Sequence, residues 1–204
     1  LLHFRMGFPA RRDINLPSKI KMKFPEAVFH INDDQEFQRT AIEIFRYQAG
    51  NNKVYNLYLK ALGKDLRKIR TIQDIPFLPV EFFRTCKVII ENTDVELVFE
   101  SSTTSGSVPS RHFISDPEVY RKSFNGAFRL FYGAPEDYII AALLPSYTER
   151  SNSSLVYMVD SLIKAGGHTG SGFYSNNEEK LMNVLYSAKS GNHKIILIGV
   201  SFAL

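Results

Sequence analysis

The chain has 204 residues, 44% of them hydrophobic and 23% charged, which is the composition of an ordinary globular protein. Its longest apolar run covers residues 138–145, far fewer than the ~20 residues that a membrane-spanning helix needs, and its single Cys86 excludes an intrachain disulfide. The formal charge of +4 arises in residues 1–21, which hold five basic side chains and one acidic side chain. We therefore expect a cytoplasmic protein with no membrane span and no nucleic-acid partner.

The two ends of the sequence favour an N-terminal fragment of a longer protein. Residues 1–21 contain Pro9 and Pro17 and show no sustained periodicity, so we expect a basic, disordered leader. The sequence starts on Leu1 rather than Met, and it stops at Leu204 directly after an apolar strand, without a turn or a cap. The alternative is a short protein with a disordered arm.

Residues 22–86 are expected to form a helical cap followed by a proline-rich segment. A helix over 33–50 is predicted from Asp33 as N-cap, Glu36 three residues later as in a capping box, and Gly50 at its end. A second helix, over 52–62, ends at Gly63. Their apolar stripes, which we interpret as packing surfaces, are Phe37, Ala41, Ile44, Phe45 and Gln48 in the first helix and Val54, Leu57, Tyr58, Ala61 and Leu62 in the second.

Between residues 75 and 99 the pattern changes from helix to strand. Two prolines keep 75–80 extended, because each disfavours helix in the residue before it. A short helical piece over 81–84 leads into a strand predicted at 87–90. Residues 91–94 have the polar composition of a hairpin turn. After this turn, apolar residues alternate as in a half-buried strand, at Val95, Leu97 and Phe99.

Residues 87–204 are expected to form an α/β half-domain, truncated at its C-terminus, with a parallel-rich sheet and flanking helices. Asp116 and Pro117 suit the N-cap and first position of a helix that runs to Tyr132, where Gly133 ends it. The rest of the pattern consists of buried strands at 138–144 and 194–200 and helices at 153–164 and 177–187. Continuous apolar strands separated by amphipathic helices are typical of a parallel sheet with helices on its faces.

A stretch of small hydroxyl residues follows the strand at Phe99. It consists of Ser101, Ser102, Thr103, Thr104, Ser105, Gly106 and Ser107, with Arg111 and His112 shortly after it. Small residues and a glycine let backbone N–H groups approach an anion, and a guanidinium can neutralise the charge of a leaving pyrophosphate. The stretch lacks both GxxxxGK[ST] and GxGxxG, which excludes a Walker A loop and a dinucleotide fingerprint. From composition alone, a solvated linker is the competing interpretation.

The residues from 99 to 112, FESSTTSGSVPSRH, resemble the phosphate loop of adenylate-forming enzymes. They are most similar to the loop of the LuxE-like acyl-protein synthetases. Further stretches are similar to the same family in order and spacing: PFLPVEFF at 76–83, LLPSYTER at 143–150 with SSL at 153–155, and GVSFAL at 199–204. The resemblance covers residues 25–204.

The resemblance implies that the full protein activates a carboxylic acid, expected to be a fatty acid, as an acyl-adenylate and then transfers the acyl group to a protein thiol. ATP would bind with Mg²⁺ on its phosphates. The loop at 101–106 would hold the β- and γ-phosphates, with Thr104 and Arg111 as catalytic residues. Residues near the carboxylate and the acyl chain would be Pro145, Ser146, Tyr147, Glu149 and Arg150. This chain alone would be inactive, since the family's later motifs would lie beyond its last residue.

Other features leave alternatives open. Thr103 stands where such loops usually have glycine, which favours a non-catalytic interaction module that keeps the fold. A serine hydrolase using Ser101 or Ser102 would need a GxSxG elbow, which is missing. We expect Cys86 to be a structural thiol and His112 to be a hydrogen-bonding loop residue. Glu100 is expected to point to the face opposite a bound phosphate.

Overall fold

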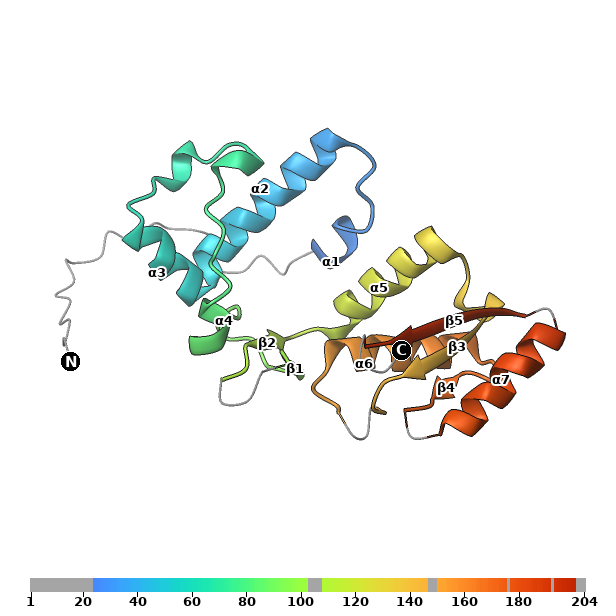
Figure 1. Cartoon of the computed structure of the whole chain (residues 1–204). Coiled ribbons are helices and arrows are strands. Elements are labelled where there is room, and N and C mark those ends of the chain that lie inside the picture. Colours follow the sequence, from blue (N-terminus) through green and yellow to red (C-terminus); the bar gives the residue numbers. More distant parts are fainter. Residues whose placement is uncertain (1–23, 103–107, 147–149, 176, 192, 201–204) are drawn as a thin grey trace.

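The computed structural model describes residues 24–102, 108–146, 150–175, 177–191 and 193–200. The architecture is mixed α/β, with a helical cap at one end and a parallel sheet flanked by helices at the other (Figure 1). A two-stranded antiparallel hairpin lies between these two parts (Figure 1). An ion pair between Glu26 and Lys122 connects the short helix α1 (Phe24–Ala27) with α5 (Pro117–Tyr132).

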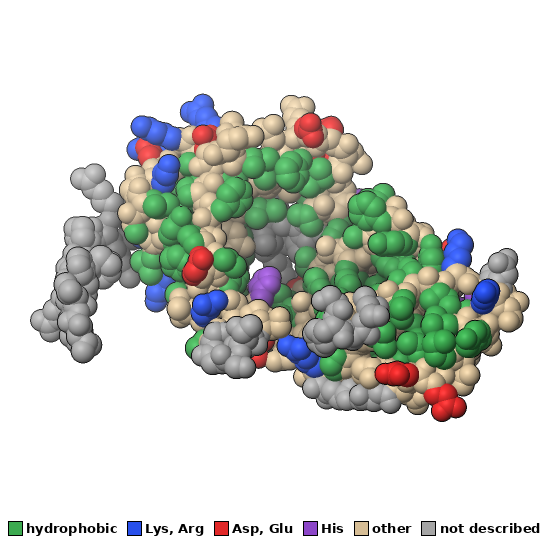
Figure 2. Space-filling model, viewed as in Figure 1, with side chains coloured by type: hydrophobic (Ala, Val, Ile, Leu, Met, Phe, Trp, Pro, Cys, Tyr) green, Lys and Arg blue, Asp and Glu red, His purple; other side chains and the backbone are tan. Residues whose placement is uncertain are grey.

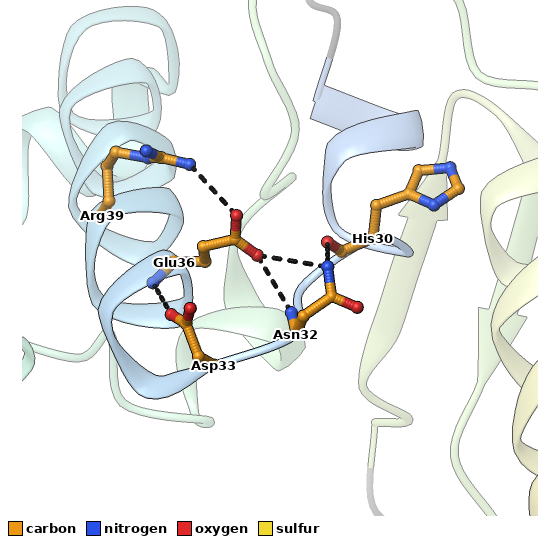
Figure 3. A network of polar contacts seen from close by, with 5 residues as sticks. All are labelled: His30, Asn32, Asp33, Glu36 and Arg39. Atoms are coloured by element: carbon orange, nitrogen blue, oxygen red, sulfur yellow. Dashed lines mark hydrogen bonds and ion pairs between the residues drawn. The ribbon is translucent and has the colours of Figure 1, made fainter.

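Helix α2 (Asp34–Asn51) begins at Asp33, as predicted. The Asp33 side chain accepts a hydrogen bond of 2.7 Å from the backbone N–H of Glu36. The capping box is shifted by one residue, because the Glu36 carboxylate binds the backbone N–H of Asn32 at 3.0 Å rather than that of Asp33. Arg39 lies beside the same carboxylate at 3.9 Å (Figure 3). Asp33 thus satisfies one backbone donor that the helix leaves free, and Glu36 satisfies the N–H of the residue before the cap. Both carboxylates also suit the positive end of the helix dipole.

The prediction that α2 ends at Gly50 is wrong, because the helix continues through Gly50 to Asn51. Asn52 ends α2 and also begins α3 (Lys53–Ala61). Its backbone N–H donates to the Gln48 carbonyl at 2.9 Å, while its side-chain oxygen accepts from the N–H of Tyr55 at 3.2 Å. A shared cap leaves no room for a glycine turn between the two helices. At the other end of α3, Gly63 adopts a φ of 62° and stops the helix, as predicted.

The core of the cap forms where α2 and α3 pack together. Its buried residues are Ile42, Phe45, Ala49, Tyr55, Leu59 and Ile69. The inner face predicted for α3 is wrong, since Leu57 and Leu62 are each 46% exposed whereas Tyr55 and Leu59 are buried. The predicted inner set and the buried pair Tyr55 and Leu59 both contain apolar residues at helical spacing, so periodicity alone could not decide which face turns inward. Burying a side chain the size of leucine stabilises the fold by about 1.5–3 kcal/mol.

The segment between the cap and the hairpin contains three short helical turns. They are η1 (Leu66–Lys68), η2 (Ile72–Asp74) and α4 (Phe82–Thr85). The strand predicted at 87–90 is wrong, because this segment has no strand pairing. The N–H of Glu91 instead donates to the carbonyl of Asn51 at 2.9 Å, which holds the segment against the end of α2. Its apolar residues Val88, Ile89 and Ile90 line a pocket together with residues of α2 and do not belong to a sheet.

The hairpin consists of β1 (Leu97–Glu100) and β2 (Arg111–Ile114), which pair antiparallel with Phe99 opposite His112 and Glu100 opposite Arg111. Phe99 is buried against the rings of Tyr120 and Tyr157, at centroid distances of 5.3 and 5.6 Å. The partner of β1 is therefore β2, across the hydroxyl-rich loop, and not the segment at 87–90.

The parallel sheet has the strand order β4 (Gly172–Phe173), β3 (Tyr138–Leu143) and β5 (Lys194–Gly199). Both neighbours run parallel to β3, which confirms the predicted class of α/β with a small parallel sheet. The two-residue strand β4 was not predicted, because its sequence carries no strand pattern. Successive β3 side chains point to opposite faces, as strand geometry requires.

Three helices cover the two faces of this sheet. Ile140 packs with α5 and with α6 (Ser154–Gly166), whereas Ala141 packs with α7 (Glu178–Ser190). Helix α5 has the predicted bounds, with Asp116 accepting from the N–H of Glu118 and Gly133 at a φ of 91°. In the part of the chain that the structure describes, no helix is both long and apolar enough to cross a membrane.

Candidate functional site

The hydroxyl-rich loop is closed at its base by the last residues of the hairpin. The N–H of Ser101 donates to the carbonyl of Ser110, and the N–H of Ser110 donates to the Ser101 hydroxyl, each at 3.0 Å. Ser101 and Ser102 are both exposed. The predicted phosphate-binding residues Thr103, Thr104, Ser105 and Gly106 lie outside the described residues. The structure thus defines the stem of the loop, a β-hairpin, and fixes where the loop leaves and rejoins it.

The second predicted region, at the end of β3, forms a turn that leads into α6. The N–H of Arg150 donates to the carbonyl of Ser146 at 3.0 Å, and the N–H of Ser153 donates to the carbonyl of Arg150 at 3.3 Å. Ser153 then caps α6, accepting a hydrogen bond from Val156. Pro145 follows the buried Leu144, whereas Tyr147 and Glu149 are outside the described residues. The turn therefore presents the N-terminal end of a 13-residue helix.

These two regions meet through Asn152. The backbone N–H of Glu100 donates to the carbonyl of Asn152 at 2.9 Å, and the Asn152 side-chain amide donates to the Glu100 carboxylate at 2.7 Å. The stem of the loop and the turn after β3 therefore lie side by side, although 52 residues separate them. Asn152 was not predicted as a site residue. Its position in a polar turn just before a helix is the only sign of it in the sequence.

Arg111 is exposed and forms no ion pair with any residue that the structure describes. Its guanidinium carbon lies 5.7 Å from the centre of the Phe113 ring. Residues directly opposite in an antiparallel pair share one face, so Glu100 lies on the face of Arg111. The expectation that Glu100 points away from a phosphate held by the loop at 101–106 stays a prediction, because most of that loop lies outside the described residues. The amide of Asn152, rather than Arg111, binds the Glu100 carboxylate.

His112 lies on the side of the hairpin that faces the cap, and Cys86 follows directly after α4. The His112 ring packs edge-on against Phe83 at a centroid distance of 5.5 Å. Partial burial lowers the pKa of His112 below its usual value, so that its imidazole is neutral at pH 7. Cys86 is half-buried, and its sulfur lies 3.7 Å from the Thr85 hydroxyl. No cluster of three or more His, Cys, Asp or Glu side chains that could hold a metal occurs among the described residues.

An apolar groove of about 570 Å³ lies between α2, the segment after α3 and the strand β2. The stripe predicted on the first helix, Phe37, Ala41, Ile44, Phe45 and Gln48, lines this groove. Its interpretation as a packing surface is thus correct for the buried Phe45, whereas Phe37 is 51% exposed. Figure 2 shows hydrophobic side chains gathered around the hollow between the cap and the sheet-bearing part. No feature of the sequence indicated that this stripe is left partly uncovered.

Comparison of the chain with protein-family models, with curated proteins and with solved structures found no match.

Proposed function

We propose that the protein takes part in the ATP-dependent activation of a carboxylic acid, expected to be a fatty acid, as an acyl-adenylate, and that the acyl group then passes to a protein thiol. The observation that carries the proposal is the contact between Glu100 and Asn152, which brings the stem of the hydroxyl-rich loop next to the residues before α6. Both regions are needed for this chemistry, since one would hold phosphate and the other would lie near the carboxylate. In this proposal the chain is the phosphate-binding part of a LuxE-like acyl-protein synthetase of the adenylate-forming superfamily.

The residues around the loop fit an anionic ligand. Arg111 carries a positive charge that no described carboxylate neutralises, and Ser101 and Ser102 expose hydroxyl groups. The N-terminal end of α6, next to the stem through Asn152 and Ser153, adds the positive end of a helix dipole. Together these groups can donate charge-assisted hydrogen bonds to phosphate oxygens.

In this mechanism the chain positions ATP and neutralises charge. The loop at 101–106 holds the β- and γ-phosphates, and Thr104 and Arg111 stabilise the pyrophosphate as the carboxylate oxygen attacks the α-phosphorus. Mg²⁺ bound with the nucleotide would supply further neutralisation of the phosphates held by the loop at 101–106. Pro145, Ser146 and Arg150, with Tyr147 and Glu149, line the approach of the carboxylate. The reaction takes place in the cytoplasm.

The test is ATP–pyrophosphate exchange with fatty acids, measured on the protein expressed from its complete reading frame. Arg111→Ala and Thr104→Ala should each weaken ATP use by about 1–3 kcal/mol, because each removes a charge-assisted or hydroxyl contact with phosphate. Arg84→Ala and Thr93→Ala remove the same groups from sites outside the loop, Arg84 being exposed and Thr93 half-buried, and should leave exchange unchanged. Equal exchange in the loop variants and in these controls would contradict the proposal.

A non-catalytic interaction module is the second candidate. The position of Glu100 on the face of Arg111 favours it, because a carboxylate near the loop opposes phosphate binding. The same assay separates the two candidates, since the module predicts no exchange in the wild-type protein.

A further inference from the structure

Strand β5 has an apolar sequence, KIILIG, yet none of its residues is buried. It pairs with β3 on one side, and the described residues place no strand on its other side. The neighbouring strand β3 shows the contrast, since Ala141 and Ala142 at its centre are fully buried. Apolar strands of a parallel sheet are normally covered on both faces. The sheet therefore ends, within the described part of the chain, at an apolar strand with an unpaired outer edge.

The two faces of β5 are covered unequally. Ile196 and Ile198 pack against the cluster that α5 forms with the sheet. Ile195 and Leu197 lie on the opposite face by strand alternation, and neither joins the cluster that α7 forms with Ala141. Leu197 is 43% exposed. Helix α7 therefore covers β3 and leaves the adjoining face of β5 open.

The flank of α7 on the β5 side continues this apolar surface. The Lys180 ammonium lies 5.9 Å from the centre of the Tyr174 ring, which places the flank of Lys180 beside β4. Met182 and Tyr186 project from the opposite flank, since they lie about 160° and 120° round the helix from Lys180. They are 45% and 65% exposed. Figure 2 shows hydrophobic side chains over the part of the surface where Figure 1 places β5 and α7.

The edge of β5 carries none of the devices that usually keep a strand edge unpaired. Proteins protect such edges with proline, with β-bulges or with charged side chains that point inward. Strand β5 has no proline, and its one charged residue, Lys194, stands at its first position with its ammonium 5.4 Å from the centre of the Tyr138 ring. Its ladder with β3 runs without a bulge from Lys194 to Gly199. The outward N–H and C=O groups of β5 form no hydrogen bond with the described residues.

The apolar surface around this edge is large enough for a stable interface. The C-terminal end of α5 lies at the start of β5, because Tyr138, which pairs with Lys194, donates a hydrogen bond to the carbonyl of Tyr132. The exposed parts of the apolar side chains amount to roughly 600 Å², most of the ~800 Å² that each partner buries in a standard interface. These side chains belong to Leu130, Phe131, Met182, Tyr186 and Leu197. The backbone of β5 adds further area when its edge is paired.

We propose that β5 pairs antiparallel with β5 of a second copy of this chain, so that the two sheets become continuous across a two-fold axis. Two copies of one strand can pair in this way because the axis brings the same edge of each to the other, and most protein dimers have this symmetry. With Leu197 on the axis, Leu197 faces its own copy and Ile196 faces Ile198, so that apolar side chains meet on both faces. This pairing goes beyond the proposed function, because it needs neither ATP nor the hydroxyl-rich loop.

The test is the mass of the 204-residue chain in solution, measured by sedimentation equilibrium over a range of protein concentrations. The wild type should form a dimer. Leu197→Lys and Leu197→Glu should each raise the dissociation constant at least about tenfold, because like charges would face each other across the axis in place of leucines. An equimolar mixture of the two variants should dimerise again, since opposite charges then meet. Leu57→Lys and Leu57→Glu are the matched controls, at a leucine of α3 that is 46% exposed, and should dimerise as the wild type does.

Each outcome bears on the pairing. A monomer at every concentration, or larger particles without a fixed stoichiometry, would overturn it. A dimer that the Leu197 variants do not weaken would overturn this surface, and a mixture of these variants that stays monomeric would overturn the antiparallel register. If circular dichroism shows that the Leu197 variants are unfolded, Tyr186→Lys replaces them, because Tyr186 is 65% exposed and should weaken the dimer in the same direction. Thr104→Ala should dimerise normally, so that failure of the proposed function and failure of this pairing give different results.

Discussion

Glu100 and Asn152 are joined by two hydrogen bonds, one between their backbones at 2.9 Å and one from the amide to the carboxylate at 2.7 Å. Asn152 thereby closes the edge of the hairpin at the point where the hydroxyl-rich loop begins. It also leaves Arg111, which lies opposite Glu100 in the hairpin, free of an ion pair with the described residues.

Replacing Asn152 with Asp tests this contact. At pH 7 a second carboxylate would face Glu100 in place of an amide donor, so the free energy of unfolding should fall by about 1–3 kcal/mol. The loss should shrink at pH 4, where two adjacent carboxylates can share a proton. Urea unfolding at both pH values measures this difference. Asn177→Asp is the matched control, since an Asp at the N-cap of α7 can accept the same hydrogen bond from Lys180. A stability loss as small as that of the control would contradict the contact.

Two helical glycines should respond to alanine in opposite directions. At Gly166 a Cβ would lie 2.9 Å from the carbonyl oxygen of Pro135, a backbone atom that cannot move aside alone. Gly166→Ala should therefore destabilise the protein by about 1–3 kcal/mol. At Gly126, in the middle of α5, no atom lies within 4 Å, so Gly126→Ala should stabilise by about 0.5–1 kcal/mol. The measurement is the melting temperature of the two variants. Shifts of the melting temperature in the same direction would contradict the close contact between Gly166 and Pro135.

Asp74 should contribute to stability in a pH-dependent way. Hydrogen bonds from the backbone N–H of Arg70, at 3.2 Å, and from the hydroxyl and N–H of Thr71, at 2.9 and 3.0 Å, lower the pKa of its carboxyl. A folded-state pKa below the unfolded one stabilises the fold above the unfolded pKa of about 3.9, and this contribution is lost as the pH falls through the folded pKa. Asp74→Asn should therefore lower the melting temperature at pH 7 and approach the wild type in acid. Asp94→Asn, at an exposed residue of the turn before β1, should show no such convergence.

Residues 1–21 lie outside the described part of the chain, and their removal is expected to leave the fold intact. Their basic, unpatterned composition predicts few stabilising contacts. Deleting them should leave the melting temperature nearly unchanged and should remove the whole formal net charge of +4. A fall of many degrees, measured by calorimetry against the full chain, would show that they pack on the core.

Local signals in the sequence were sufficient where a few adjacent residues decide the structure. Asp116, Pro117 and Gly133 set the two ends of α5, and the predicted bounds agree with the structure. Strand β3 was predicted from its continuous apolar run, and the structure shows that its central residues are buried. These elements depend on caps and hydrophobic runs that can be read over a short window.

Long-range pairing could not be predicted in the same way. The apolar residues at 87–90 have the composition of a strand, but the hydrogen bond from Glu91 to Asn51 places them against α2. The face of α3 that turns inward depends on where α2 lies, and the contact of Glu100 with Asn152 depends on how the hairpin docks on α5 and α6. Of the candidate site, the sequence indicated the loop, Arg111 and the turn after β3, whereas the groove and Asn152 emerged only from the packing.

Asn52, which ends α2 and begins α3, has a consequence for the kinetics of local opening. A nine-residue helix such as α3 is too short to be stable alone in water. The N–H of Tyr55, in the first turn of α3, is bonded to the Asn52 side chain, which is itself anchored on Gln48. The N-terminal end of α3 therefore cannot fray without releasing the end of α2. The two helices should therefore behave as one unit in hydrogen exchange, with the amides of Asn52 and Tyr55 opening together. One wall of the groove would then keep its shape until both helices open.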